Sequence, residues 1–319
     1  MSLSIFAPAS IGNVSVGFDI LGMAVKPVDG TLLGDVVSIE AAEQNSLIVE
    51  GAFSAKLPAD PKENIVWQCI DLYNKHLAEL GKTAQPVKLT LDKKMPVGSG
   101  LGSSACSVVA ALHALNAFYD KPFNDMAMLN MMGEMEAQIS GSLHYDNVAP
   151  CFLGGLQLML PDAVNVTRTL PGFSQFYYIM AYPGIEVSTK AAREVLPTSY
   201  SRADVVTFGQ NLAAFVDACH RQDAKQAFAQ FNDVVAEPYR CHLLPGFEQA
   251  RAELLNMGSV AVGISGSGPT LFAICDDLTK AQAQAQWLQD NYVQNELGFV
   301  HVCQLDEQGA IVLPDAAAS

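Results

Sequence analysis

The chain has 319 residues, of which 50% are hydrophobic and only 16% are charged, so it can bury a core large enough for one large domain or two. Its formal net charge of −15 disfavours nucleic acid or an anionic membrane as a partner, because both attract cationic surfaces. No signal peptide and no membrane-spanning run is predicted, and the seven cysteines are scattered without a Cys-x-x-Cys pair. We therefore expect a cytoplasmic protein with reduced thiols.

Hydrophobic periodicity and turn residues predict alternating strands and helices in the first half of the chain. The predicted strands are 36–40, 47–49, 87–92 and 152–160, and the predicted helices are 64–80, 103–119 and 124–140. In the second half, strands are predicted at 176–181, 260–264 and 270–275, and helices at 204–220, 223–236, 246–257 and around 281–292. A closing hairpin is predicted from 300–305 and 310–313, with its turn at Gln308-Gly309.

Strands and helices are mixed without strict βαβ alternation, which favours an α+β fold over a doubly wound sheet. Pro161-Asp162 reads as a turn. We place a domain boundary near this point, which gives an N-terminal domain of residues 1–165 and a C-terminal domain of residues 166–319.

A segment rich in glycine and serine follows the predicted strand 87–92 and opens the predicted helix at Ser103. Its backbone can approach a ligand closely and, with the unpaired N–H groups of the helix N-terminus, can bind a triphosphate. It lacks the lysine of a Walker A motif and the spacing of a dinucleotide fingerprint. A plain Gly/Ser turn with a serine helix cap is the alternative interpretation. This segment, called the phosphate loop from here on, consists of Pro96, Val97, Gly98, Ser99, Gly100, Leu101, Gly102, Ser103, Ser104 and Ala105.

This segment resembles the signature Pro-x-x-x-Gly-Leu-Gly-Ser-Ser-Ala of the kinase superfamily that includes galactokinase, homoserine kinase, mevalonate kinase and phosphomevalonate kinase. Residues 7–19 and 263–270 resemble two further motifs of that superfamily, in the same order. The segments 17–22, 144–150, 188–193 and 237–240 are similar to the homoserine kinase branch. The resemblance implies an N-terminal domain like ribosomal protein S5 domain 2, a ferredoxin-like C-terminal domain, and a site for ATP and substrate between them.

The resemblance also implies that the substrates are ATP and L-homoserine, in a step of threonine biosynthesis, and that the protein is a homodimer. Homoserine carries an ammonium, a carboxylate and the acceptor hydroxyl, so its site needs an anion and cations. Asp19 matches the ammonium partner, and Asn13 matches a residue near the reacting hydroxyl. The residues that match the carboxylate side or otherwise face the substrate are His144, Asn147, Thr189, Arg193 and Arg240. Arginine suits a carboxylate because its planar fork donates two parallel hydrogen bonds.

Glu136 lies eight residues before His144, the spacing of the family's magnesium-binding glutamate, whereas Glu134 would face another side of the helix. A serine hydroxyl of the phosphate loop, Ser103 or Ser104, is the second expected Mg²⁺ ligand, and we favour Ser104. Asn64 matches a position near the nucleotide base. Asp146 is a candidate base next to Asn147, but the family pattern assigns it no catalytic role.

No general base is evident, so the resemblance implies direct transfer aided by alignment and charge stabilisation, with Asn147 and Arg193 as the catalytic residues. Two alternatives remain open. One is a kinase of the same superfamily that acts on another small hydroxy acid, and the other is a nucleotide-binding relative without turnover.

Overall fold

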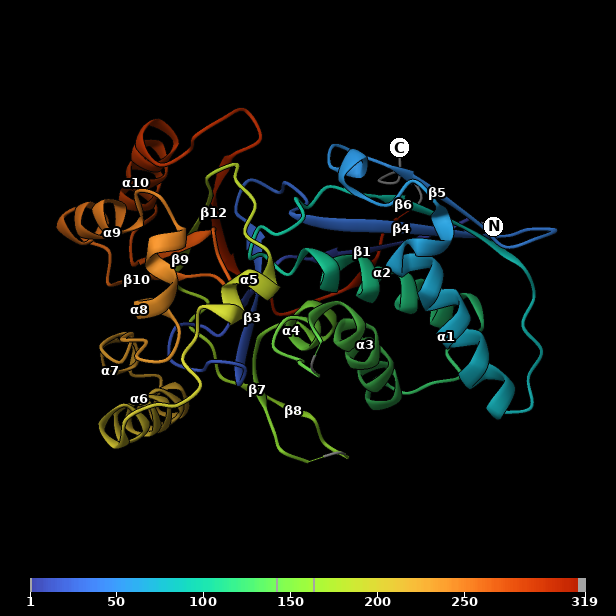
Figure 1. Ribbon diagram of the computed structural model, residues 1–319, viewed down its shortest axis with the longest axis horizontal. Coiled ribbons are helices and arrows are strands. Elements are labelled where there is room, and N and C mark those ends of the chain that lie inside the picture. Colours follow the sequence, from blue (N-terminus) through green and yellow to red (C-terminus); the bar gives the residue numbers. More distant parts are fainter. Residues whose placement is uncertain (1, 142, 163, 315–319) are drawn as a thin grey trace.

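A computed structural model describes residues 2–141, 143–162 and 164–314, which form two sheets with helices packed on them (Figure 1). The first sheet has five strands in the order β13-β1-β4-β6-β5, all antiparallel except the parallel pair β5 and β6. These strands are β1 (Leu3–Pro8), β4 (Gly34–Ala41), β5 (Ser46–Glu50), β6 (Val87–Asp92) and β13 (Ile311–Val312).

Helix α2 (Ser103–Phe118) packs on β1 and β4 of the first sheet, because nearly its whole surface is apolar and buried. Three more helices surround α2: α1 (Ile65–Glu79), α3 (Asp125–Ser140) and α4 (Val148–Leu153). Asn64 and Asn124 begin α1 and α3 by accepting backbone N–H groups of the first turn. Two 3₁₀ turns, Ser54–Lys56 and Pro61–Glu63, precede α1.

The second sheet runs in the order β10-β11-β9-β12-β3-β7-β8, and β2 pairs with β3 at its side. Its strands alternate their side chains between two apolar cores, as the two-residue period of a strand requires. Tyr178 and Met180 face the large core, whereas Ile179 and Ala181 face a smaller one. The strands are β2 (Ser10–Gly12), β3 (Leu21–Pro27), β7 (Leu156–Met159), β8 (Thr167–Leu170), β9 (Tyr177–Tyr182), β10 (Ala261–Ile264), β11 (Leu271–Cys275) and β12 (Phe299–Leu305).

Helices cover both faces of the second sheet. The smaller core lies under α9 (Phe247–Asn256) and α10 (Leu278–Asn291), and the large core continues under α6 (Arg202–Arg221) and α7 (Ala224–Phe228). The short helix α5 (Thr189–Glu194) lies near the middle of the molecule, whereas α8 (Glu237–Arg240), followed by the 3₁₀ turn Cys241–Leu243, lies on the side of the second sheet (Figure 1). The mixture of helices and mainly antiparallel strands confirms the predicted α+β class.

Three predicted elements are wrong, each for a physical reason. The strand predicted at 152–160 is β7 only, because Gly154 and Gly155 take left-handed backbone angles and separate it from α4. The helix predicted at 223–236 ends at Phe228, and the side chain of Asp233 accepts the N–H groups of the following turn.

The predicted closing hairpin does not form. Strand β12 has β3 and β9 as its two neighbours, so neither of its edges is left for β13. Strand β13 pairs instead with β1 in the other sheet. Both ends of the chain therefore lie near the first sheet (Figure 1). Because β3 and β13 each join a sheet built mainly from the other half of the chain, no sheet is confined to residues 1–165 or 166–319, and that boundary stays a prediction.

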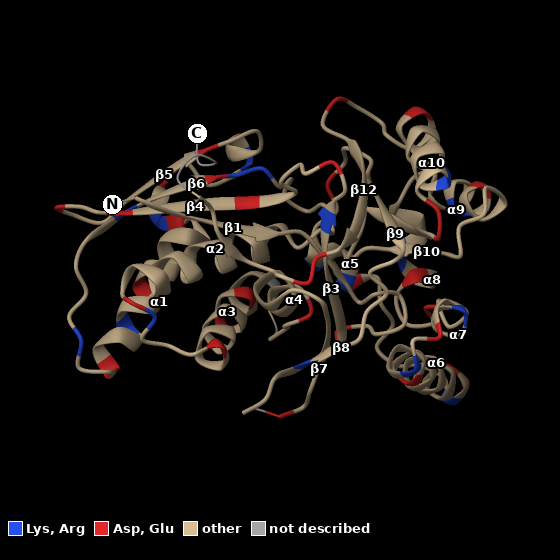
Figure 2. Cartoon of the chain, turned by 180° about the vertical axis from the view of Figure 1, so that it is seen from behind, with Lys and Arg blue, Asp and Glu red and all other residues tan. Residues whose placement is uncertain are grey.

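Within the described residues, no helix is long and apolar enough to cross a membrane. Across the same residues, Lys and Arg are scattered over both halves of the chain rather than gathered into one stripe (Figure 2).

A substitution of Gly22 tests whether β3 packs closely against the segment that follows α3. A Cβ at this position would overlap the backbone carbonyl oxygen of Asp146, so Gly22→Ala should lower the free energy of unfolding by about 1–3 kcal/mol or more. Gly209, in the middle of α6, has open space around it, so Gly209→Ala should raise the stability by about 0.5–1 kcal/mol. Urea denaturation of both variants checks this, and equal effects would contradict it.

Candidate active site

A cavity of about 440 Å³ lies between the phosphate loop, the loop from β2 to β3, helices α5 and α8, and the loop between β10 and β11. It collects most of the residues that the sequence singled out, although they come from segments more than 200 residues apart. Those that line it are Asn13, Asp19, Asn64, Val97, Gly98, Ser99, Gly100, Gly102, Ser103, Ser104, Glu136, His144, Asn147, Thr189, Arg193 and Arg240. The side chains of Leu101 and Ala105 are fully buried in the core instead, and Pro96 is not among the lining residues.

The carbonyl groups of the phosphate loop are turned away from the cavity by hydrogen bonds to other segments. The carbonyl of Ser99 accepts from the hydroxyl of Thr270 at 2.7 Å and from its N–H at 3.1 Å. The hydroxyl of Ser265 donates to the carbonyl of Gly100 at 2.7 Å. The carbonyls of Gly98 and Leu101 accept from the N–H groups of Val187 and Ser10.

The N–H groups of the same loop are left for a ligand. Across residues 97–104, all of which the structure describes, no backbone N–H donates a hydrogen bond within the protein. The loop leads directly into the N-terminus of α2, where the helix dipole adds partial positive charge. Unpaired N–H groups at such a position form an anion-binding concavity.

The glycines of the loop have a second role beyond ligand approach. Gly98, Gly100 and Gly102 all have left-handed backbone angles, which side chains with a Cβ rarely adopt. A Cβ on Gly100 would overlap the carbonyl of Ser265 and contact Gly268, so this glycine also lets the two loops pack together.

Lys93, to which the sequence analysis gave no role, supports the loop from below. It is almost fully buried and donates to Asp35 at 2.5 Å, to the carbonyl of Ser103 at 2.8 Å and to the hydroxyl of Ser107 at 2.9 Å. Asp35 also accepts the N–H groups of Lys94 and Met95, so the end of β6 and the start of α2 are tied to one buried charge pair. The only hint of this role in the sequence is that Lys93 lies just before the loop, which begins at Pro96.

Ser104 and Glu136 face each other across the cavity wall. The hydroxyl of Ser104 donates to Glu136 Oε2 at 3.0 Å, whereas the hydroxyl of Ser103 donates to the carbonyl of Met95. Burial raises the pKa of Glu136 to about 7, and the hydrogen bond from Ser104 and the charge of Lys93 oppose this shift. Glu134 is half exposed on another side of α3 and lies 3.9 Å from His76.

Asn13 and Asp19 lie in a tight loop between β2 and β3, in which Asn13, Val14, Ser15 and Asp19 all have positive φ. A β-branched valine at φ +45° is strained, so the surroundings must hold this loop in place. Asn13 does so with its own amide: its Oδ1 accepts the N–H of Asp19 at 2.9 Å, and its Nδ2 donates to the carbonyl of Gly266 at 3.1 Å.

Two arginines lie over the ring of Phe18, a residue that the sequence analysis did not assign. The guanidinium carbons of Arg193 and Arg240 are 5.7 and 5.3 Å from the ring centroid. Arg193, on α5 beside Thr189, binds both carboxylate oxygens of Asp19 at 2.8 and 3.2 Å. In the sequence, the only indication of this contact is that the aromatic residue Phe18 directly precedes Asp19.

Arg240 is almost fully buried and is held by backbone groups. It donates to the carbonyl of Ala192 at 2.9 Å and to that of Gly266 at 3.1 Å, so it joins α5 to the loop between β10 and β11. Burial lowers the pKa of its guanidinium. A contact between Arg240 and a substrate carboxylate stays a prediction.

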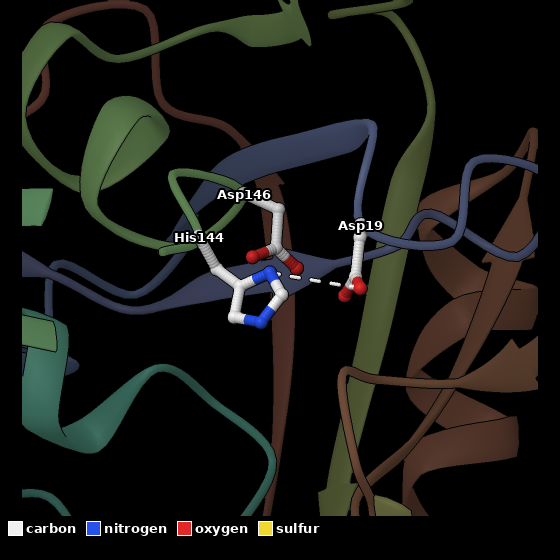
Figure 3. A group of neighbouring side chains, drawn as sticks. All are labelled: Asp19, His144 and Asp146. Atoms are coloured by element: carbon white, nitrogen blue, oxygen red, sulfur yellow. Dashed lines mark ion pairs between the residues drawn. The ribbon is translucent and has the colours of Figure 1, made fainter. Parts of the chain in front are cut away.

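His144 and Asp146, from the segment between α3 and α4, lie next to Asp19 in the cavity (Figure 3). Asn147 of the same segment also lines the cavity. His144 Nδ1 lies 3.6 Å from Asp19 Oδ2, and burial lowers the pKa of this histidine. Burial, together with the nearby charge of Asp19, raises the pKa of Asp146 to about 7. Asn147 precedes α4, and its Oδ1 accepts from the hydroxyl of Ser10 at 2.9 Å.

The far end of the cavity is apolar around Asn64. Leu57, Pro58, Ile65 and Ile139 line it. The Oδ1 of Asn64 caps α1, and its buried Nδ2 has no hydrogen-bond partner within the described residues. An apolar slot with one unsatisfied donor suits a flat heteroaromatic ring.

Comparison with known proteins decides the family. The family model for the GHMP kinases N terminal domain matches residues 64–155, and the model for GHMP kinases C terminal matches residues 215–294. A homoserine kinase from Cytophaga hutchinsonii is 33% identical, with 98% of this chain and 97% of that chain covered and a TM-score of 0.87. The chain belongs to the GHMP kinase family.

Two more distant structures share the fold of this kinase. Streptococcus pneumoniae phosphomevalonate kinase is 12% identical with a TM-score of 0.69, over 98% of this chain and 99% of that chain. Mevalonate kinase from L. major, in complex with R-mevalonate, is 15% identical with a TM-score of 0.68, over 94% and 95%. Membership of the GHMP kinase family makes phosphoryl transfer from ATP the chemistry of this kinase. The binding of the nucleotide by the phosphate loop stays a prediction.

The raised pKa of Glu136 predicts a pH-dependent stability difference. Between the ordinary pKa of about 4.5 and about 7, the folded kinase holds a proton that the unfolded chain has lost, so this group contributes less stability as the pH rises through that window. Gln resembles the protonated form. With a chelator present, Glu136→Gln should match the wild-type Tm near pH 5 and exceed it near pH 8.

The control is Glu134→Gln, which changes a half-exposed carboxylate on the same helix and should leave the Tm unchanged at both pH values. If the Tm difference between Glu136→Gln and the wild type were the same at pH 5 and pH 8, the carboxylate would titrate normally in the folded kinase.

Proposed function

We propose that this kinase transfers the γ-phosphate of ATP to the side-chain hydroxyl of L-homoserine and forms O-phospho-L-homoserine, a step of threonine biosynthesis. The observation that carries the proposal is that the opposite charges of Asp19, Arg193 and Arg240 line the same cavity as the phosphate loop. A zwitterionic acceptor with a hydroxyl three bonds from its α-carbon matches these groups. The 33% identity to a homoserine kinase supports the same acceptor.

The proposal includes Mg²⁺, and the residues present fit it. The carboxylate of Glu136 is buried beside the cavity, and the Ser104 hydroxyl lies next to it at the start of α2, so the pair offers the oxygen ligands that Mg²⁺ prefers. Mg²⁺ is bound by one or two protein oxygens plus phosphate oxygens and water. Ser104 and Glu136 would hold the ion, which would supply positive charge to the transferring phosphate.

The remaining residues bind and align the reactants. The N–H groups of residues 97–104 would cradle the phosphates, and Asn64 with its apolar neighbours would hold the base. Thr189, Arg193 and Arg240 would bind the acceptor, and Arg193 would reach the transferring phosphate by leaving Asp19, to which it is now bound. Asn147 would orient the acceptor hydroxyl from the N-terminus of α4. Alignment and charge stabilisation suffice for a loose transition state.

The domain boundary near residue 165, the homodimer and the cytoplasmic location belong to the same proposal. The boundary rests on the turn at Pro161-Asp162, the location on the scattered cysteines, and the homodimer on the resemblance. The two alternatives are a kinase that acts on another hydroxy acid and a nucleotide-binding protein without turnover. A single assay distinguishes both from the proposed function.

A coupled ADP-release assay with L-homoserine, mevalonate, galactose and L-threonine tests the proposal. L-Homoserine should give a kcat/KM about 100-fold or more above the others, because only it places all three groups correctly. Glu136→Gln should lower kcat with homoserine by roughly 100-fold or more, while Glu134→Gln should not. Equal turnover with another acceptor, or none with any of the four, would refute homoserine kinase activity.

A further inference from the structure

The ring of Phe18 lies where two positive charges of the cavity come together. The guanidinium carbons of Arg193, on α5, and Arg240, on α8, lie 5.7 and 5.3 Å from the ring centroid. Burial, together with the nearby charge of Arg193, lowers the pKa of Arg240. Like charges that share a partly buried site repel each other, so their approach must be stabilised by other contacts.

Hydrogen bonds supply only part of that stabilisation. Arg193 binds both oxygens of Asp19, but its buried Nε has no hydrogen-bond partner within the described residues. Arg240 is held by two backbone carbonyls, which carry no net charge. The face of an aromatic ring carries negative potential, so Phe18 supplies an attraction that these hydrogen bonds lack.

Phe18 also borders a second cavity, of about 240 Å³. Among the residues that the structure describes, it is the one that lines both this cavity and the candidate active site. The polar groups of the second cavity are satisfied, because the Tyr200 hydroxyl donates to the carbonyl of Val235 and Asp204 accepts the N–H of Ser201. The other lining residues are Ile20, Val205 and Phe208. Since the ring borders an apolar void, close packing does not fix its position completely, and the contact with the arginines must contribute.

We propose that Phe18 is a positioning residue, whose ring face holds the guanidinium groups of Arg193 and Arg240 side by side for the carboxylate of the acceptor. This inference rests on the proposed function, which assigns that carboxylate to the two arginines. Phe18 and Asp19 are neighbours in the strained loop between β2 and β3, so one loop places a ring face against both arginines and a carboxylate against one of them. Strained backbone that its surroundings hold in place is typical of a functional site.

A ring with a purely structural role would fill the same space without using its negative face. Fluorine atoms on a phenylalanine ring withdraw electron density from that face and change the size of the ring little, so they separate the two roles. The experiment places phenylalanine with one, two or three ring fluorines at position 18 of the full-length kinase.

The KM for L-homoserine should rise stepwise with the number of fluorines, by about 5- to 10-fold with three, because the attraction for the two cations weakens. The KM for ATP should stay the same. 3-Aminopropan-1-ol has the hydroxyl and the ammonium of homoserine but no carboxylate, so its inhibition constant should not change along the series. Phe18→Leu, which is apolar and has no aromatic face, should raise the KM for homoserine at least as much as three fluorines do.

Phe208 is the matched control. It is a partly buried phenylalanine on the wall of the same second cavity, and no arginine lies over its ring within the part of the chain that the structure describes. The same fluorinated residues at position 208 should leave the KM for homoserine unchanged.

The Tm of the ligand-free kinase gives a second readout that does not depend on turnover. Because the arginines contact the ring before any substrate binds, the Tm should fall stepwise with fluorination of Phe18. Fluorination of Phe208 should not lower it.

Two results would overturn the role of Phe18. One is a KM for homoserine that stays constant along the fluorine series while Phe18→Leu raises it, because the ring would then only fill space. The other is an equal change for homoserine and 3-aminopropan-1-ol, because the ring would then not act through the carboxylate. A wild type that does not phosphorylate homoserine would refute the proposed function instead, and the Tm series alone would then decide whether the ring holds the arginines.

Discussion

The anchoring of the phosphate-loop carbonyls is the constraint on which the site depends. Thr270, Ser265, Val187 and Ser10 each bind one of four consecutive carbonyls, from Gly98 to Leu101. With the carbonyls held outward, the N–H groups of the loop remain directed at the ligand, and the start of α2 adds its dipole. Three of these four donors come from the C-terminal half of the chain, so the anion site exists only when both halves are packed together.

The cavity is lined by buried carboxylates whose charged form is disfavoured in the unliganded protein. Burial raises the pKa values of Glu136 and Asp146 to about 7, and Glu136 lies where the metal ion is proposed to bind. Lys93 and Asp35, by contrast, form a buried ion pair beneath the loop and support it. Binding of the metal ion would favour the charged form of Glu136.

The sequence could predict what short-range patterns encode. The bounds of α1, α2 and α3 agree with the structure to within about two residues, because each has a strong helical period and a capping or turn residue. The phosphate loop and the spacing of Glu136 also came from local pattern and resemblance. Pairing between distant segments could not be predicted: nothing near Ile311 indicates that its partner is β1, and nothing near Arg240 shows that backbone carbonyls occupy its donors.

The affinity of the metal-free kinase for ADP, measured by calorimetry in the variant Ser265→Ala, tests the anchoring most directly. The variant removes the hydroxyl that holds the carbonyl of Gly100 and that does not line the cavity itself. Ser259→Ala, which removes a buried hydroxyl that precedes β10 and donates to Gln284, is the control. We expect Ser265→Ala to weaken ADP binding by about 5- to 10-fold, the worth of one hydrogen bond, and Ser259→Ala to leave it unchanged. Equal affinities in the two variants would contradict the account.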